Sequence, residues 1–130
     1  MKCLLAFLFS LTVFCGFSES YYLTIRYSFT KIESGYDHKN KVIVYVDGDK
    51  ERESVPKIES EENSVRVKVS EGSHDIKIED WVFYKDNWEL HSKANSYSFD
   101  LINTKTVDMD RNKTMIIIYD LDTGPEITVE

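Results

Sequence analysis

Apolar and polar residues alternate with a period of two along most of this chain. The alternation is clearest in two runs, residues 64–70 and 74–79, which flank a turn centred on Gly72. The apolar positions of these runs are Val65, Val67, Val69, Ile76 and Ile78. A period of two on both sides of a glycine turn predicts a β-hairpin with one buried and one solvated face. We therefore expect this hairpin to form the middle of an antiparallel β domain.

Further segments with the strand pattern follow at short intervals, separated by turn signals. They are residues 21–29, 41–46, 55–58, 88–91, 97–101, 106–110, 113–119 and 126–129. Residues 41–46 and 115–119 are apolar on both faces, which predicts central strands, whereas 126–129 is expected at an edge. Residues 106–119 are expected to form a second hairpin around Arg111 and Asn112. No stretch of ten residues has helical spacing of apolar residues, so the prediction is an all-β protein. We expect an antiparallel Ig-like β-sandwich of about seven to eight short strands.

The alternation is interrupted at Asp80. If the register of the preceding isoleucines continues, Asp80 faces inward while Trp81 and Phe83 face solvent. A β-bulge near residues 79–80 would instead reset the register and bury both aromatic side chains. We favour the bulge, because burying an unpaired aspartate costs several kcal/mol.

Trp81, Phe83 and Trp88 are the candidate ligand-binding residues. The bulge would bury Trp81 and Phe83, and the strand at residues 88–91 is expected to direct Trp88 and Leu90 inward. With an unbroken register, large aromatic rings stand in solvent, where a flat ring can stack on a sugar. The direction in which these rings point therefore separates a structural role from a binding role.

Residues 1–18 are predicted to be a signal peptide. Lys2 precedes an uncharged apolar run at residues 4–14, and small residues at Gly16 and Ser18 favour cleavage before Glu19. The run is shorter than the roughly 20 residues that a membrane-spanning helix needs. A lipoprotein anchored through Cys15 is the alternative, although the bulky Phe14 occupies a position where a small residue is expected. Residues 19–130 are therefore expected to be a single domain outside the cytoplasm, secreted or periplasmic.

The composition of residues 19–130 narrows the choice of partners. Without Lys2, this segment has 15 basic and 23 acidic residues, a net charge of −8. Such a negative field repels nucleic acid and anionic lipid surfaces, so neither is an expected partner. Both cysteines, Cys3 and Cys15, precede residue 19, so we expect a mature domain with neither disulfide nor thiol chemistry.

Sequence motifs for catalysis or metal binding are not found. His38, His74 and His91 lack the spacing of a zinc site, and the chain has no Gly-x-Ser-x-Gly or glycine-rich phosphate loop. We expect no enzyme activity, no catalytic residue, no metal and no cofactor. A small secreted hydrolase is kept as an alternative, because the two carboxylates of a glycosidase meet only in the fold. Asn112 begins a glycosylation sequon, which matters only in a host that glycosylates secreted chains.

Three short segments carry a family resemblance. Residues 45–48 (Tyr-Val-Asp-Gly), 55–56 (Val-Pro) and 71–78 (Glu-Gly-Ser-His-Asp-Ile-Lys-Ile) resemble the core of PEGA-like and related Ig-like or transthyretin-like surface domains. In such domains a strand ends in an Asp-Gly turn and a later hairpin carries Gly, His and a β-branched pair. The resemblance implies an extracytoplasmic accessory or binding module without catalytic residues.

The expected function is therefore binding or structure at the cell surface, by a secreted or periplasmic β-sandwich module without catalysis. Its partner would be a protein or a glycan, and no transmembrane segment is expected in residues 19–130. A carbohydrate-binding module that uses exposed Trp81, Phe83 and Trp88 is the alternative.

Overall fold

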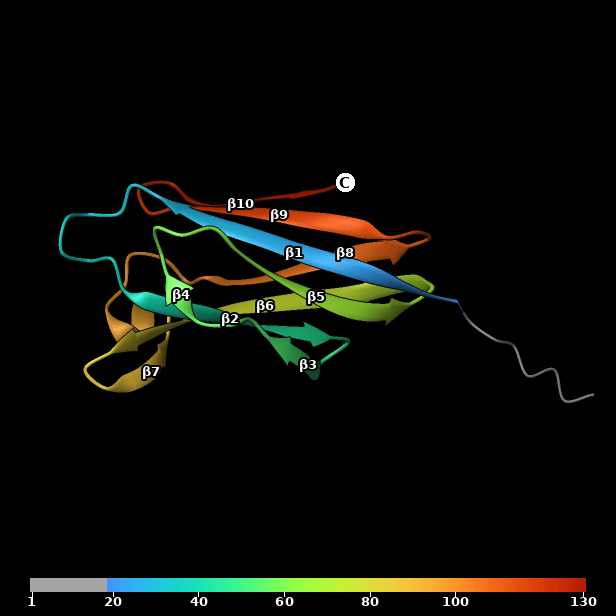
Figure 1. Ribbon diagram of the computed structural model, residues 1–130, viewed down its shortest axis with the longest axis horizontal. Helices are drawn as coiled ribbons and strands as arrows, with labels where there is room; N and C mark the ends of the chain where they lie inside the picture. The colour runs from blue at the N-terminus through green and yellow to red at the C-terminus, as the bar shows by residue number, and fades with distance from the viewer. Residues whose placement is uncertain (1–18) are drawn as a thin grey trace, which may run out of the picture.

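The computed structural model describes residues 19–130 (Figure 1). The predicted signal peptide and Cys15 lie outside the described residues, so the structure does not test them. The described part contains ten strands and one short 3-10 helix. They are β1 (Ser20–Thr30), β2 (Lys39–Val46), β3 (Asp49–Glu53), β4 (Lys57–Ile58), β5 (Asn63–Ser70), β6 (Gly72–Tyr84), β7 (Asn87–Leu90), η1 (Lys93–Asn95), β8 (Ile102–Met109), β9 (Lys113–Asp120) and β10 (Gly124–Val129). No helix within residues 19–130 has the length and apolar character needed to cross a membrane.

The strands form two sheets that face each other (Figure 1). One sheet has the order β10-β9-β1-β5, which we call sheet A. The other, sheet B, has the order β3-β2-β6-β7, with β4 paired to β2 and β8 paired to β6. The all-β prediction is confirmed. The expectation of purely antiparallel strands is wrong for sheet A, because β1 and β9 run parallel. The ten strands also outnumber the expected seven to eight. The polar β3 lies outside every expected segment, and the segment expected at residues 55–58 is present only as the two-residue β4.

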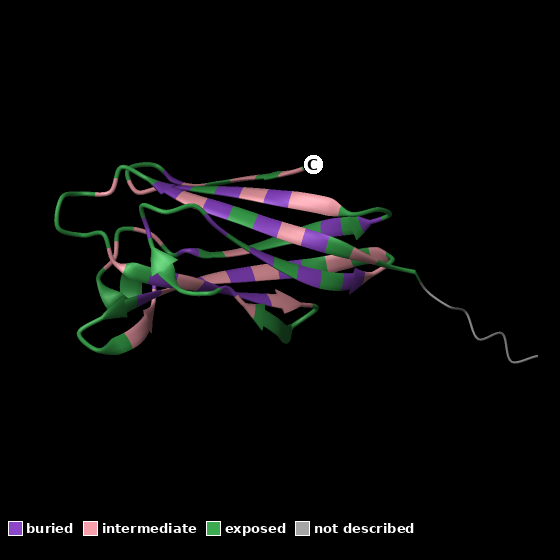
Figure 2. Cartoon of the chain, in the orientation of Figure 1, coloured by how far each residue is buried: buried purple, intermediate pink, exposed green. Residues whose placement is uncertain are grey.

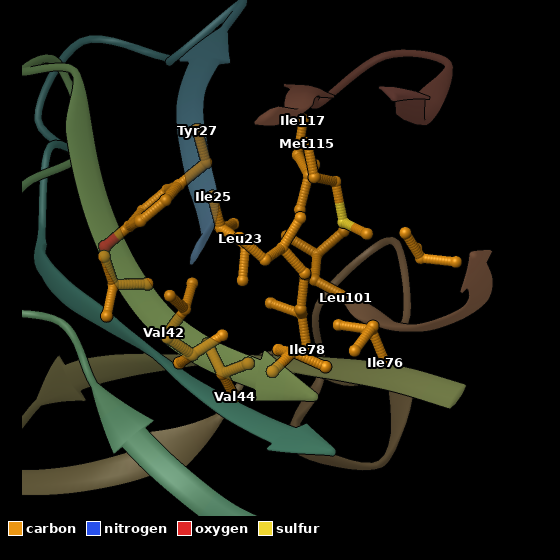
Figure 3. Packing of buried hydrophobic residues seen from close by; sticks show 14 of the residues in the cluster. Leu23, Ile25, Tyr27, Val42, Val44, Ile76, Ile78, Leu101, Met115 and Ile117 are labelled. Atoms are coloured by element: carbon orange, nitrogen blue, oxygen red, sulfur yellow. The ribbon is translucent and has the colours of Figure 1, made fainter. Parts of the chain in front are cut away.

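The core lies between the two sheets and is built from the alternating apolar positions (Figure 2). Leu23 and Ile25 of β1 meet Val42 and Val44 of β2 and the isoleucines of β6 across this layer (Figure 3). Alternation places every second side chain on the inner face, so each strand contributes one side to a shared apolar layer. The predicted central positions of β2 and β9 are confirmed, as is the edge position of β10.

Both predicted hairpins are wrong, although the apolar positions predicted to be buried in β5 and β6 are buried. β5 pairs with β1 in sheet A, whereas β6 pairs with β2, β7 and β8 in sheet B. The single residue Glu71 joins β5 to β6, and Gly72 takes a positive φ of 113° at this corner. Similarly, β8 lies in sheet B and β9 in sheet A. Period-two alternation shows which face of a strand is buried but does not identify the strand beside it, so these turns carry the chain across the core.

The predicted bulge near residues 79–80 is also wrong. The register between β2 and β6 is continuous, with Val42 opposite Asp80 and Lys41 opposite Trp81. Asp80 consequently faces inward and is fully buried. On its other edge, β6 changes partner at this point: the Asp80 amide donates to the carbonyl of Leu101, and the His91 amide donates to the carbonyl of Asp80.

The segment between β7 and β8 also departs from the prediction. Residues 97–101 were expected to form a strand, but they belong to an excursion that leaves the sheet after His91 and returns at Leu101. In β7, Trp88 pairs with Phe83, and Leu90 pairs with Trp81. Trp88 and Leu90 therefore lie on the outer face of sheet B, which corrects their predicted inward orientation. His91, immediately after β7, is buried instead.

Candidate functional site

The three predicted site residues form one cluster on the outer face of sheet B, beside β7. Phe83 and Trp88 sit opposite each other, with ring centroids 5.3 Å apart and ring planes inclined by 57°. Trp81 lies two residues before Phe83 on the same face and pairs with Leu90. Its indole Nε1 is buried and has no hydrogen-bond partner within residues 19–130. The sequence thus correctly grouped these three aromatics, but it placed the group on the wrong face of the sheet.

The aromatic cluster is partly covered by a chain of charged side chains. Lys41 Nζ lies 4.5 Å from the ring centroid of Trp88 and 2.7 Å from Glu53 Oε1. Lys50 Nζ lies 2.6 Å from the other oxygen of Glu53. The two ammonium groups lower the pKa of Glu53 to about 2, so this carboxylate is ionised at all ordinary pH values. One face of Trp88 is therefore occupied by Lys41. Trp81 and Trp88 are half-buried, and Phe83 is the most exposed of the three rings.

A cavity of about 370 Å³ opens at the end of the molecule that carries β7 (left in Figure 1). Its walls come from the β1–β2 loop, the segment after β4, the β6–β7 hairpin, the excursion between β7 and β8, and the β9–β10 loop. These segments are far apart in the sequence. The excursion and the two loops extend beyond the paired strands, so the ends of both sheets contribute to the walls.

Asp80 and His91 form a buried pair beside this cavity. Asn40 Nδ2 donates to Asp80 Oδ1 at 2.7 Å, and His91 Nδ1 lies 3.2 Å from Asp80 Oδ2. Burial raises the pKa of Asp80, and contacts with His91 and Asn40 oppose the rise. The His91 ring lines the cavity and packs on Tyr97, with centroids 4.2 Å apart. The two groups are in close contact at the cavity wall, although neither Asp80 Oδ2 nor His91 Nδ1 has a hydrogen-bond partner within residues 19–130.

Glu59 is the most deeply buried carboxyl group that lines the cavity. Only 4% of the residue is exposed, and its side chain makes no hydrogen bond within the described residues. The neighbouring Asp37 carboxylate, in contrast, accepts hydrogen bonds from the backbone and hydroxyl of Ser60. Burial raises the pKa of Glu59 to about 8, and the negative charges of Asp80 and Asp37 add to the rise. A buried carboxyl group with a raised pKa and no hydrogen-bond partner does not stabilise the ionised form of the domain. Groups of this kind are common in functional sites, which makes the cavity the candidate site.

Aromatic rings form two further walls. The rings of Tyr36 and His38 are 6.2 Å apart, and those of His38 and Tyr84 are 5.5 Å apart. On the excursion, the Tyr97 hydroxyl donates to Glu89 Oε1 at 2.6 Å. Burial and this hydrogen bond to a carboxylate both raise the pKa of Tyr97, so the phenol stays protonated. The cavity thus combines ring faces with carboxyl groups, which is a binding surface for a small organic molecule.

The histidines are divided between the two ends of the domain. His38 and His91 line the cavity, whereas His74 Nδ1 lies 2.6 Å from Asp47 Oδ2 at the far end of β6. Asp47 also accepts from the amide of Asp75, so this pair fixes the turn after β2. In the part of the chain that the structure describes, no three His, Cys, Asp or Glu side chains are grouped to hold a metal ion.

The cavity was missed by the sequence analysis, and the chain offers only one signal for it. The signal is Asp80, an acid at an inward position of the alternation, with His91 shortly after the next strand. An acid and a histidine placed in this way can form a buried pair. Glu59 gives no such signal, because it begins the polar run 59–64 and resembles any solvated acid. Comparison with protein families, curated proteins and solved structures finds no match to this chain.

Proposed function

We propose that this chain is a non-catalytic binding domain that acts outside the cytoplasm and holds a small ligand in the end cavity. The observation that carries the proposal is the cavity itself, about 370 Å³ and lined by polar groups that are buried at its walls. Small-molecule sites typically occupy about 300–1,000 Å³ and combine apolar or aromatic walls with a few convergent polar groups. Glu59, Glu89 and His91 supply those groups here.

The proposed location and class rest on the sequence. Residues 1–18 have the charge and hydropathy pattern of a secretory signal, which supports a secreted or periplasmic mature chain. An Ig-like domain related to PEGA-like modules is supported by the two facing sheets and by corners that carry consecutive strands from one sheet to the other. Domains of this class commonly bind their ligands through the loops at one end of the sheets, and this cavity lies at such an end.

Native mass spectrometry of protein recovered from outside the cytoplasm tests both parts of the proposal. We expect a polypeptide mass that begins at Glu19, together with a non-covalent small-molecule adduct. Ser98 is exposed, lines the cavity and makes no side-chain hydrogen bond within residues 19–130, so Ser98→Trp should fill the cavity and remove the adduct. The matched control is Ser73→Trp, which places the same side chain on an exposed position of β6 outside the cavity.

Each outcome of this experiment decides one part. An intact Met1, or a diacylglycerol on Cys15, contradicts the proposed soluble extracytoplasmic chain. Wild-type protein without an adduct, or an adduct that survives Ser98→Trp, contradicts the cavity as the binding site. Loss of the adduct in both tryptophan variants would also contradict it, because the loss would then not depend on the cavity.

Carbohydrate binding is the second candidate function, and the unbroken β6 register favours it. That register puts Trp81 and Phe83 on the outer face with Trp88, next to the Lys41–Glu53 ion pair. Aromatic faces beside charged hydrogen-bonding groups suit a sugar ring. The partial cover of Trp88 by Lys41 makes this surface a weaker candidate than the cavity, since the ring is already stacked on a cation.

Trp81→Ala separates structure from binding at this surface. Because Trp81 is half-buried on the outer face, its removal should cost about 1–2 kcal/mol in a urea titration, less than the ~3–5 kcal/mol of a core aromatic. A loss of about 3–5 kcal/mol in the free energy of unfolding would show that the Trp81 ring has a structural role. Affinity electrophoresis through gels that contain polysaccharides measures the binding role. Retardation of the wild type that Phe83→Ala and Trp81→Ala both abolish would favour the carbohydrate function, and no retardation in any gel would exclude it for those polysaccharides.

A further inference from the structure

We infer that the ligand of the end cavity is a small organic cation, with a protonated amine that pairs with Glu59. The inference rests on the proposed function, because it names the chemical class of ligand for the same cavity. Three independent features of the cavity support it: a buried carboxyl group without a hydrogen-bond partner, an excess of acidic side chains, and aromatic rings in the lining.

Glu59 is the first feature. It is 4% exposed, it lines the cavity, and its carboxyl group has no hydrogen-bond partner within the described residues. A buried polar group normally has a partner, because the loss of its water is otherwise uncompensated. The other buried acid nearby, Asp80, accepts a hydrogen bond from Asn40 at Oδ1, whereas its Oδ2 lies 3.2 Å from His91 Nδ1 without a hydrogen bond. Of these two acids only Glu59 lines the cavity, so it is the one that a ligand entering the cavity can contact.

The charge of the lining is the second feature. Four carboxyl groups, those of Glu33, Glu59, Glu89 and Asp122, line the cavity together with one ammonium group, that of Lys31. Such a lining raises the local concentration of cations and repels anions. The net charge of residues 19–130, −8, has the same sign and steers a cation toward the domain. A ligand carboxylate or phosphate would add to the excess of negative charge.

The rings are the third feature. Tyr84 packs beside His38 on one wall, and Tyr97 packs on His91 on another. Phe99 lies on the same excursion as Tyr97 and also lines the cavity. Aromatic faces attract cations through the ring quadrupole and also cover the hydrocarbon part of an amine. The site would thus bind an ammonium group at Glu59 and a short apolar body between the rings.

Pairing with a cation requires the ionised form of Glu59, so binding is linked to pH. The pKa of Glu59 in the empty site is about 8, and a bound ammonium group should lower it. Binding below pH 8 then releases a proton, and affinity should rise with pH by up to about tenfold per unit. The carboxyl groups of Asp37 and Asp80 act on Glu59, and the imidazoles of His38 and His91 also line the cavity. A Glu59 variant is therefore needed to isolate the contribution of this carboxyl group.

Three probes of matched size test the inference: 2-phenylethylammonium, 2-phenylethanol and 3-phenylpropanoate, which are cationic, neutral and anionic. Their affinities for the purified protein would be measured by isothermal titration calorimetry at pH 6 and pH 8, and the binding site by NMR shifts of backbone amides. We expect the ammonium probe to bind about tenfold or more tightly than either of the others at pH 8, with shifts at Glu59 and residues 95–99. Glu59→Gln should remove this preference and most of the proton release. The control Glu126→Gln makes the same substitution at an exposed position on β10, outside the cavity, and should leave both intact.

The possible results separate this inference from the proposed function. Equal or tighter binding of the alcohol or the carboxylate, with shifts at the same amides, would overturn the cation inference and leave a ligand cavity in place. An ammonium preference that Glu59→Gln retains would overturn it too, because Glu59 would not be the pairing group. If none of the three probes shifts these amides, the cavity is not a binding site for such molecules, and both the inference and the proposed function fail.

Discussion

Replacement of Ile117 by aspartate is expected to leave the protein unfolded. Ile117 has no exposed surface and lies in the middle of β9, between Tyr27 of β1 and Ile127 of β10. A carboxylate at this position would be surrounded by the apolar side chains that the two sheets share (Figure 3). The effective cost of burying an unpaired ion is several kcal/mol, which is comparable with the total stability of about 5–15 kcal/mol of a typical domain. Far-ultraviolet circular dichroism and a urea titration measure the outcome.

The neighbouring residue provides a matched control on the same strand. Ile118 faces outward and is 37% exposed, so Ile118→Asp should reduce the free energy of unfolding by no more than about 1 kcal/mol. Lys113, at the start of β9, would be a poor control. Its side chain is largely covered, donates to the carbonyl of Asp108 and lies 3.3 Å from Asp110. If Ile117→Asp and Ile118→Asp are equally stable, β9 does not separate a core face from a solvent face.

The sequence predicted the faces of the strands well and their partners poorly. Val65, Val67 and Val69 are buried as expected, as are Ile76 and Ile78. The two runs nevertheless lie in different sheets. Side-chain alternation follows from the local pleat and from one buried face, whereas strand pairing depends on contacts between distant residues. A tight connection can close a hairpin within one sheet or carry the chain across to the other, and period-two alternation is the same in both cases.

Asp80 shows why a cost estimate from neighbouring residues can fail. The expectation of a bulge treats an inward Asp80 as an unpaired buried acid. The structure supplies Asn40 on β2, 40 positions away, which donates to Asp80 Oδ1, and it places His91, 11 positions away, 3.2 Å from Oδ2. Burial also raises the pKa of Asp80 and so favours the neutral carboxyl group, which is tolerated inside while the strand keeps its register. Trp81 and Phe83 consequently face outward. Because the sequence did not reveal the hydrogen bond from Asn40 to Asp80, both candidate site residues were predicted on the wrong face.

Of the two candidate binding surfaces, the sequence indicates the residues of one and gives little sign of the other. The aromatic cluster could be predicted because large apolar residues stand out in a short, otherwise regular stretch of sequence. The cavity could not be, because it depends on loops that converge from distant parts of the chain. Glu59 is one of 23 acidic residues, and only its place behind the β1–β2 loop removes it from water. The features that make Glu59 a candidate site residue, its burial beside the cavity and its raised pKa, belong to the fold and not to the local sequence.

Glu59→Gln is expected to stabilise the unliganded protein at pH 8. The folded-state pKa of Glu59 is raised to about 8 from an ordinary value of 4.5, so between these values the folded protein binds a proton that the unfolded chain has lost. The contribution of the protonated group is fully present below about pH 4.5 and is lost as the pH rises through about 8. The wild type should therefore lose up to about 1.4 kcal/mol per pH unit across this interval through Glu59 alone. Glutamine has nearly the same shape and cannot ionise, so the variant avoids this loss.

Urea titrations of both proteins at pH 5 and pH 8 measure the effect. The difference in free energy of unfolding should be small at pH 5 and should reach about 3–4 kcal/mol in favour of Glu59→Gln at pH 8. Other ionisable groups are common to both proteins and cancel in the difference, while the exposed control Glu126→Gln should stay within about 0.5 kcal/mol of the wild type at both pH values. A Glu59→Gln variant that is less stable than the wild type at pH 8 would mean that the carboxylate is ionised and satisfied within the protein. A gain in stability would instead show that this domain retains a destabilising acid in its cavity, and residues of that kind are characteristic of binding sites, where stability is exchanged for function.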